Sequence, residues 1–268
     1  MVTRHRARII LTINQTTVIF ILMNDNRLIR FGEPNAKLKA LTKKLKLTLK
    51  TFSLPAGWSC PGAKDCLSKA ERETGRITDG PNTEFRCFAA SGEARSPSLR
   101  KMVWNNYNKI LWALQDGVKA CADLIHDSLP EKFDVMRVHV GGDYFSKQYL
   151  EAWINVAMRN PDKIFYSYSK SLHLFKQYAL PQNLVLTASR GGKFDELIEL
   201  HGWKEAVVVY SEEEAEKLGL EIDHDDTHAA FGKENFALLI HGTQPAGSEA
   251  SKALQKIKKL RKEKLIKG

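Results

Sequence analysis

The sequence predicts a single α/β domain with parallel strands, of the size of a TIM-type barrel. Predicted strands and helices alternate about six times along the chain, which is typical of parallel βα units joined by right-handed crossovers. The length of 268 residues fits one α/β barrel of about 250 residues. No internal repeat or low-complexity linker divides the chain.

The predicted elements follow in order. Asn35 is a predicted N-cap of a short lysine-rich helix, after which leucines alternate with polar residues in a strand ending at Leu54. A long amphipathic helix is predicted over residues 98–128. Further strands are predicted over 135–140, 161–167, 183–188, 205–210 and 236–241. Helices are predicted over 146–159, 172–178, 194–201 and 211–218 and from Ser248 onward, with a capping box at Ser211 and Glu214.

The positive charge is concentrated in short segments. Of the net charge of +10, residues 1–22 contribute +3 (three Arg) and residues 252–268 contribute +7 (eight Lys or Arg against one Glu), so 10 − 3 − 7 leaves zero for residues 23–251. Six further lysines lie between Lys37 and Lys50. Such lysine-rich segments could bind nucleic acid or could simply be solvated.

These segments set the expected boundaries. Residues 1–22 begin with arginines and continue with an apolar run, as in a signal peptide, but polar residues interrupt the run and no small-residue cleavage site follows. We therefore expect a leader over 1–22 outside the fold, a barrel over 23–247 and a lysine-rich helix over 248–268. No stretch of 18 apolar residues predicts a membrane span. Four cysteines do not suggest a secreted disulfide scaffold, so we expect a cytoplasmic protein.

Three of the four cysteines lie in loop-type sequence directly after a predicted strand. Cys60, Cys66 and Cys87 are surrounded by turn residues, whereas Cys121 belongs to an apolar helical pattern. Three loop thiolates could hold a metal ion or an iron–sulfur cluster and leave one coordination position open. The alternative is one disulfide with free thiols.

Polar residues follow the other predicted strands, and the carboxyl ends of parallel strands meet at one edge of a sheet. We therefore expect them to converge on one mouth. They are Cys60, residues 141–143, residues 167–170, Ser189, Arg190, Ser211 and residues 241–243, and they include Gly141, Gly142, Asp143, Ser167, Lys170 and His241. Arg137 and His139 share one face of their strand, and in a barrel both would point into the lumen, where they would need either partners or a ligand.

Several phrases of the sequence resemble the phage gene product 88 family. They are the segment from Leu54 to Cys66 (LPAGWSCPGAKDC) and residues 86–89, 137–146, 165–171 and 236–245. The resemblance covers about residues 25–255.

A more distant resemblance is to radical S-adenosylmethionine enzymes, which have a cysteine loop after the first strand and a glycine-rich acidic motif after the second. It implies a partial (β/α)6 barrel, TIM-barrel-like, in which Cys60, Cys66 and Cys87 bind a 4Fe–4S cluster. The resemblance also implies that Gly141 and Gly142 let the backbone approach S-adenosylmethionine and that Asp143 pairs with the ammonium group of this cofactor. Later strand ends complete the site: Ser167 and Ser189 would bind the cofactor, and Lys170, Arg190, His139 and Arg137 are the candidate catalytic residues. Two features depart from the motif: the cysteine gaps are five and twenty residues instead of three and two, and Asp replaces Glu.

The expected function is therefore that of a phage-encoded iron–sulfur protein of the radical S-adenosylmethionine type in the host cytoplasm. Cleavage of S-adenosylmethionine by the cluster would generate a 5′-deoxyadenosyl radical, acting on a small-molecule or nucleic-acid substrate. The alternative is a non-catalytic, nucleic-acid-associated phage protein with structural or zinc-bound thiols, which binds through its lysine-rich segments.

Overall fold

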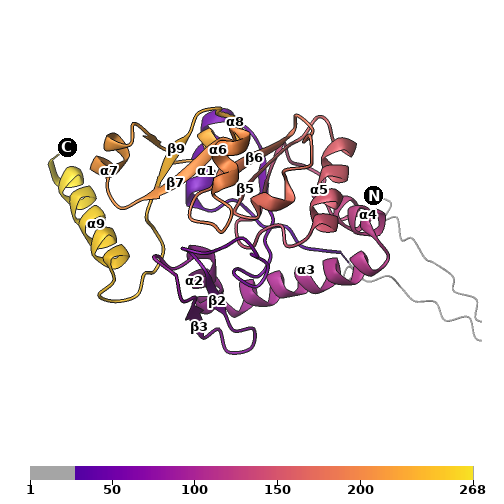
Figure 1. The fold of residues 1–268 in the computed structure, drawn as a ribbon, viewed down its shortest axis with the longest axis horizontal. Helices are drawn as coiled ribbons and strands as arrows, with labels where there is room; N and C mark the ends of the chain where they lie inside the picture. The colour runs from indigo at the N-terminus through magenta and orange to yellow at the C-terminus, as the bar shows by residue number, and fades with distance from the viewer. Residues whose placement is uncertain (1–27, 268) are drawn as a thin grey trace, which may run out of the picture.

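The computed structural model describes residues 28–267 and the side chains of 28–263 (Figure 1). The predicted leader over 1–22 lies outside the described residues. The main element is a seven-stranded sheet in which every strand pair is parallel. The strand order is β1 (Leu49–Thr51), β4 (Val135–Val138), β5 (Ile164–Ser169), β6 (Leu184–Ser189), β7 (Glu205–Val209), β9 (Phe236–Leu239) and β8 (Glu221–Ile222).

The parallel α/β fold predicted from the sequence is thus confirmed. Apart from β8, the strands of this sheet lie side by side in chain order, as repeated βα units require. Among the described residues β1 does not pair with β8, so the sheet is open and no closed barrel forms.

Helices cover both faces of the sheet. One face packs against α3 (Pro97–Gln115), α4 (Val118–Asp127) and α5 (Lys147–Arg159) through a large core that contains Phe52, Trp153 and Phe165. The other face packs against α1 (Ala36–Leu45) and α8 (Thr227–Phe231) through Leu38 and Ala229. The remaining helices are η2 (Leu172–Leu174), α6 (Glu196–His201), α7 (Glu212–Lys217) and α9 (Glu249–Lys267).

Predicted helix caps are present where the sequence signals them. The Asn35 side chain accepts a hydrogen bond from the Leu38 N–H and begins α1. Ser211 accepts from the Glu214 N–H, and the Glu214 carboxylate accepts from the Tyr210 N–H, which fixes the start of α7.

Other predictions were wrong in detail. The single helix expected over 98–128 is two helices, because Gly117 between α3 and α4 has φ of 96°, which a right-handed helix does not allow. The strand expected to end at Leu54 is only the three residues of β1. Four further features were not predicted: α2 (Phe88–Arg95), α8, β8 and the antiparallel hairpin of β2 (Ser68–Ala70) and β3 (Ile77–Asp79).

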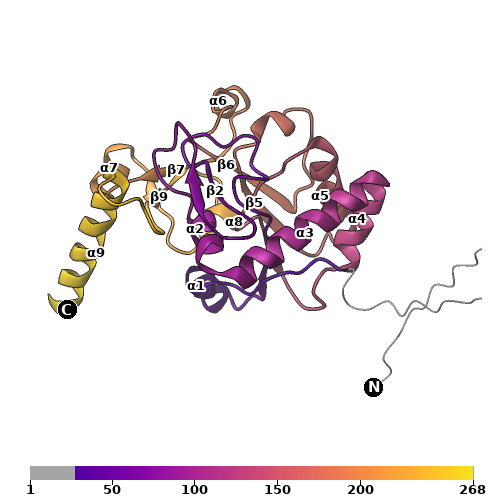
Figure 2. The same ribbon diagram turned by 90° about the horizontal axis from the view of Figure 1, so that it is seen from below.

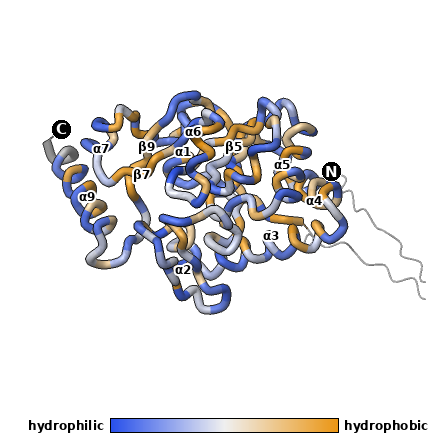
Figure 3. Tube along the Cα trace, in the orientation of Figure 1, coloured by the Kyte–Doolittle hydropathy of each residue, from blue (hydrophilic) through white to orange (hydrophobic). Residues whose placement is uncertain are grey.

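The basic C-terminal helix α9 lies at the opposite end of the molecule from α3, α4 and α5 in both views (Figures 1 and 2). Ala250 and Ile257 are buried against Val209 and Leu239 of the neighbouring strands. Most of α9 is hydrophilic, whereas β7 is hydrophobic (Figure 3). Among the described helices, none has the length and apolar content needed to cross a bilayer.

Candidate functional site

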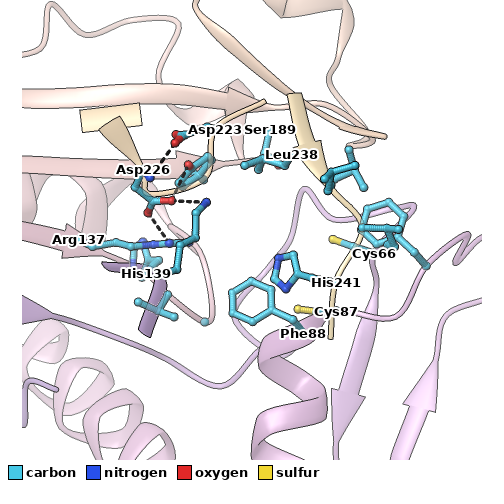
Figure 4. Close-up of a pocket in the computed structure, with 18 of the residues that line it drawn as sticks. Cys66, Cys87, Phe88, Arg137, His139, Ser189, Asp223, Asp226, Leu238 and His241 are labelled. Atoms are coloured by element: carbon cyan, nitrogen blue, oxygen red, sulfur yellow. Dashed lines mark hydrogen bonds and ion pairs between the residues drawn. The ribbon is translucent and has the colours of Figure 1, made fainter. Parts of the chain in front are cut away.

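A cavity of about 610 Å³ lies where the strands of the main sheet end. Its wall includes residues at or just after the carboxyl ends of β4, β5, β6 and β9, together with the segment that follows β1. Two groups face each other across it in Figure 4: Cys66, Cys87, Phe88 and His241 on one side, Arg137 and Asp226 on the other. Of the twelve predicted site residues, ten line this cavity and two, Ser167 and Arg190, do not.

The segment that carries Cys60 crosses the ends of β4, β5 and β6. Gly62 touches the backbone at Lys170, where an added Cβ would lie 2.0 Å from the Lys170 carbonyl oxygen. Gly142 has φ of 83°, and its Cβ would lie 2.6 Å from Ser59 Oγ. Both glycines are therefore required by contacts within the chain, and these contacts hold the cysteine segment over the cavity.

The three predicted cysteine ligands line the same cavity. Cys60 Sγ accepts a hydrogen bond from the Gly57 N–H at 3.2 Å. Cys87 is the N-cap of α2, and its own N–H donates to Ser68 Oγ at 3.2 Å. All three thiols are only partly exposed, and none forms a disulfide. Because Cys87 is the N-cap of α2, its sulfur lies at the positive end of the helix dipole, which favours a thiolate.

Burial keeps these thiols protonated when no cation is present. Burial raises the pKa of Cys60 well above its ordinary value, and the negative charges of Asp143 and the other two thiolates add to the shift. Burial also raises the pKa of Cys66, with Lys170 opposing the shift. The pKa of Cys87 rises to about 12, again mainly through burial and then through Cys66. These mutual effects show that the three sulfurs are electrostatic neighbours, so a positive group among them would favour deprotonation.

The thiols are not gathered around a single point. Within residues 28–267, no three His, Cys, Asp or Glu side chains form a group that could hold a metal ion. Cys121 is fully buried in α4, away from the cavity, as its apolar pattern predicted.

Asp143 is buried and its carboxylate is fully used by the chain. Oδ1 accepts from the Tyr144 N–H and the Ser169 hydroxyl, both at 2.7 Å. Oδ2 accepts from the N–H groups of Lys170 at 2.9 Å and Ser171 at 3.1 Å. Burial raises the pKa of Asp143, and these four hydrogen bonds oppose the shift. A carboxylate has about four lone-pair positions, so the residue fixes the loop after β5 and has none left for a ligand.

The two predicted site cations Lys170 and Arg190 differ in their positions, because Lys170 lines the cavity and Arg190 does not. Lys170 Nζ donates to the carbonyl oxygens of Ser189 and Arg190, and so joins the end of β5 to that of β6. The guanidinium of Arg190 forms ion pairs with Glu199 and Glu205 outside the cavity wall.

An ion-pair cluster forms the opposite wall of the cavity. Arg137 Nη1 donates to Asp226 Oδ2 at 2.5 Å, and its guanidinium lies 4.9 Å from the centre of the Tyr168 ring. Asp226 also accepts from Lys37 Nζ at 2.7 Å and from the hydroxyls of Tyr166 and Tyr168. Burial alone would raise the pKa of Asp226, but Arg137 and Lys37 outweigh it and hold the pKa at about 2.

His139 follows β4 on the same side as Arg137 and has φ of 68°, unusual for a residue with a side chain. Its Nε2 shares a hydrogen bond with the Tyr149 hydroxyl at 2.9 Å, and Nδ1 has no partner among the described residues. Burial lowers the pKa of His139 to about 3, so the ring is neutral at physiological pH. A neutral ring in the cavity wall can accept or donate one proton but carries no charge for binding.

His241 lines this cavity as expected, whereas Ser211 and Thr243 do not. Lys37, Phe88 and Asp226 also line it and were not predicted at the mouth. The Phe88 and His241 rings lie 4.7 Å apart, and the carboxamide of Gln244 joins their segments by hydrogen bonds to Arg86 and to the His241 carbonyl. Lys37 and Asp226 lie in none of the quoted motifs and reach the cavity through the packing of α1 and α8, whereas Phe88 begins α2 directly after Cys87.

The comparisons with known proteins give one match. The model of the family described as Gene product 88 matches residues 24–260, which is most of the chain. No curated protein and no solved structure matches.

Proposed function

We propose that this chain, which belongs to the gene product 88 family, binds an iron–sulfur cluster through Cys60, Cys66 and Cys87. The observation that carries the proposal is that three thiols line one cavity at the carboxyl ends of parallel strands, although twenty residues separate Cys66 from Cys87. Ligands in parallel α/β folds bind at this edge. We also propose that the open sheet is a partial TIM-type barrel, because its strands follow one another nearly in chain order.

The donor set favours a cluster over a single zinc ion. A zinc ion needs three or four ligand atoms within about 2.3 Å of one point, and the described residues offer no such group. A 4Fe–4S cluster binds each thiolate at a different iron, so its cysteines stand farther apart.

The volume of about 610 Å³ leaves room for a second occupant beside a cluster. We propose S-adenosylmethionine, and with it chemistry of the radical type, because one open iron would remain for it. When bound together, a reduced cluster and S-adenosylmethionine would supply reductive cleavage of a carbon–sulfur bond, with the one electron coming from the cluster. The chain shapes their cavity: Lys170 joins two strand ends, and Arg137, paired with Asp226, forms part of the far wall. Asp143 is assigned to the loop after β5 and not to the ammonium group, because its four acceptor positions are filled.

Anaerobic reconstitution with iron and sulfide tests the proposal. We expect absorbance near about 400 nm from thiolate–iron charge transfer and bound iron and sulfide in equal amounts. Cys60→Ala, Cys66→Ala and Cys87→Ala should each abolish most of this absorbance. Cys121→Ala is the matched control, because this thiol is buried in α4, and it should retain the full signal. Equal absorbance in all four variants would exclude the three thiols as ligands.

The second candidate function is nucleic-acid association with structural or zinc-bound thiols. The exposed basic face of α9 favours it. Zinc bound in equal amount to the chain, with no iron retained after reconstitution, would support this candidate against the first.

A further inference from the structure

Two basic segments that are far apart in the sequence flank the cavity. Asn35, Ala36 and Lys37 at the start of α1 line it, and so does Arg261 of α9. The C-terminal end of α9 and helix α1 lie on the same side of the molecule in both views (Figures 1 and 2). The mouth of the cavity therefore lies between the two lysine-rich segments.

The cations beside this mouth are available to a ligand. Lys258, Lys259, Arg261 and Lys262 are exposed, and they form no ion pair within the described part of the chain. On α1, Lys39 and Lys43 are likewise exposed and unpaired among the described residues. The first half of α9 differs, because Lys252 pairs with Glu249 and Lys256 lies near Glu213. Free positive charge is thus concentrated in the half of α9 nearest its C-terminus.

The geometry favours a polyanion over a lipid surface as the partner of these cations. A helix that lies on a membrane inserts its apolar face among the lipids. The apolar edge of α9 is occupied instead, since Ala250 and Ile257 are buried against the sheet. The C-terminal half of α9 exposes Leu260, at 40%, and four cations. These cations suit a chain of phosphates.

We propose that single-stranded nucleic acid binds across this mouth, with phosphates along the C-terminal half of α9 and on α1 and one nucleotide at the cavity. Phe88 and His241 at the cavity edge offer ring faces on which a base can stack. A base within a duplex would first have to leave its stack to reach this cavity, so a single strand binds better. That the strand is a substrate rests on the proposed cofactor site, whereas its binding does not.

Fluorescence anisotropy with a labelled twelve-nucleotide oligothymidylate, at several salt concentrations, tests the inference. We expect the logarithm of the affinity to fall steeply with the logarithm of salt concentration, each phosphate contact contributing about 0.7 to the slope. The double variant Lys258→Ala/Arg261→Ala should reduce the slope by about 1.4. The control Lys101→Ala/Lys132→Ala removes two exposed lysines elsewhere, on α3 and before β4, and should leave the slope unchanged.

Stacking is tested separately from charge. Phe88→Leu keeps an apolar side chain of similar size but removes the ring, and should weaken binding about tenfold at constant salt slope. A duplex of the same sequence should bind more weakly than the single strand.

Equal slopes for the two double variants would overturn the inference, as would binding to phosphatidylserine vesicles with no binding to the oligonucleotide. Strand binding by a wild-type protein that takes up no iron on reconstitution would refute the cofactor proposal and leave the inference standing. A cluster that forms in a wild-type protein without affinity for the oligonucleotide would refute the inference and leave the cofactor proposal standing.

Discussion

Replacing Asp143 distinguishes a residue that holds the loop after β5 from one that binds a ligand. Its carboxylate accepts hydrogen bonds from the Tyr144, Lys170 and Ser171 N–H groups and from the Ser169 hydroxyl, and the residue is 4% exposed. Asp143→Ala leaves all four donors without this acceptor. A buried donor that loses its partner costs about 1–3 kcal/mol.

We take the lower end of that range, because water can reach the loop from the cavity, and expect Asp143→Ala to lower the free energy of unfolding by about 4 kcal/mol. Asp143→Asn keeps one acceptor oxygen, so about half that loss is expected. Urea denaturation at pH 7, followed by circular dichroism, measures both values. Asp127→Ala, at the exposed end of α4, is the control and should change the value by less than about 0.5 kcal/mol.

A loss below about 1 kcal/mol in Asp143→Ala would refute the assignment of this carboxylate to the loop. If Asp143 instead paired with an ammonium group of a ligand, Asp143→Asn would weaken S-adenosylmethionine binding and leave the unfolding free energy nearly unchanged. Calorimetric titration of the reconstituted protein with S-adenosylmethionine therefore complements the denaturation experiment.

Three further predictions concern the frame of the cavity. Gly142→Ala should destabilise the protein by about 2 kcal/mol more than Gly202→Ala in urea denaturation, since both have positive φ but only Gly142 would bring its Cβ to 2.6 Å from Ser59 Oγ. Burial raises the pKa of Glu93 to about 7, so its contribution to stability is complete below its unfolded pKa and lost as pH rises through 7. Glu93→Gln should therefore gain about 2 kcal/mol relative to wild type between pH 5 and pH 8, measured by denaturation at each pH. The pKa of Asp226 is lowered to about 2 in the folded protein, so its ionised carboxylate stabilises the fold at any pH above the pKa of an unfolded Asp. The wild type should therefore lose about 2 kcal/mol of unfolding free energy between pH 4 and pH 2 in acid titration, whereas Asp226→Asn should not show this loss.

The positions of most strands of the main sheet could be predicted from the sequence, because a buried strand of a parallel sheet is an apolar run followed by polar residues. Phe236 to Leu239 is such a run, and Val135 to Val138 is one except for Arg137. The break at Gly117 was missed because the apolar period continues across it from α3 into α4, and a single glycine inside a helical pattern is often tolerated. Short elements such as β8, of two residues, carry too few side chains to show any period.

The two walls of the cavity differed in how far they could be predicted. The three cysteines and the glycines after β4 stand in local patterns, and the rule that strand ends converge brought them together correctly. Asp226 stands in a run of acids and histidines that resembles a solvated turn. Its role depends on Arg137, 89 residues away in the chain, and on Tyr166 across the sheet. No local pattern encodes that meeting, because only the packing of α8 on the sheet creates it.

The direction in which the positive charge of α9 points depends on how the helix packs on the sheet. The sequence concentrates the net charge outside residues 23–251, but it gives no direction to that charge, since a lysine-rich helix could point anywhere. Burial of Ile257 fixes the rotation of α9 about its axis, so Arg261, four positions further on, reaches the cavity. The same rotation leaves Lys258 and Lys259 in solvent. One apolar contact thus decides whether the positive charge of α9 acts on the cavity, and Ile257→Asp should release the helix and lower the salt slope of strand binding toward that of the Lys258→Ala/Arg261→Ala variant.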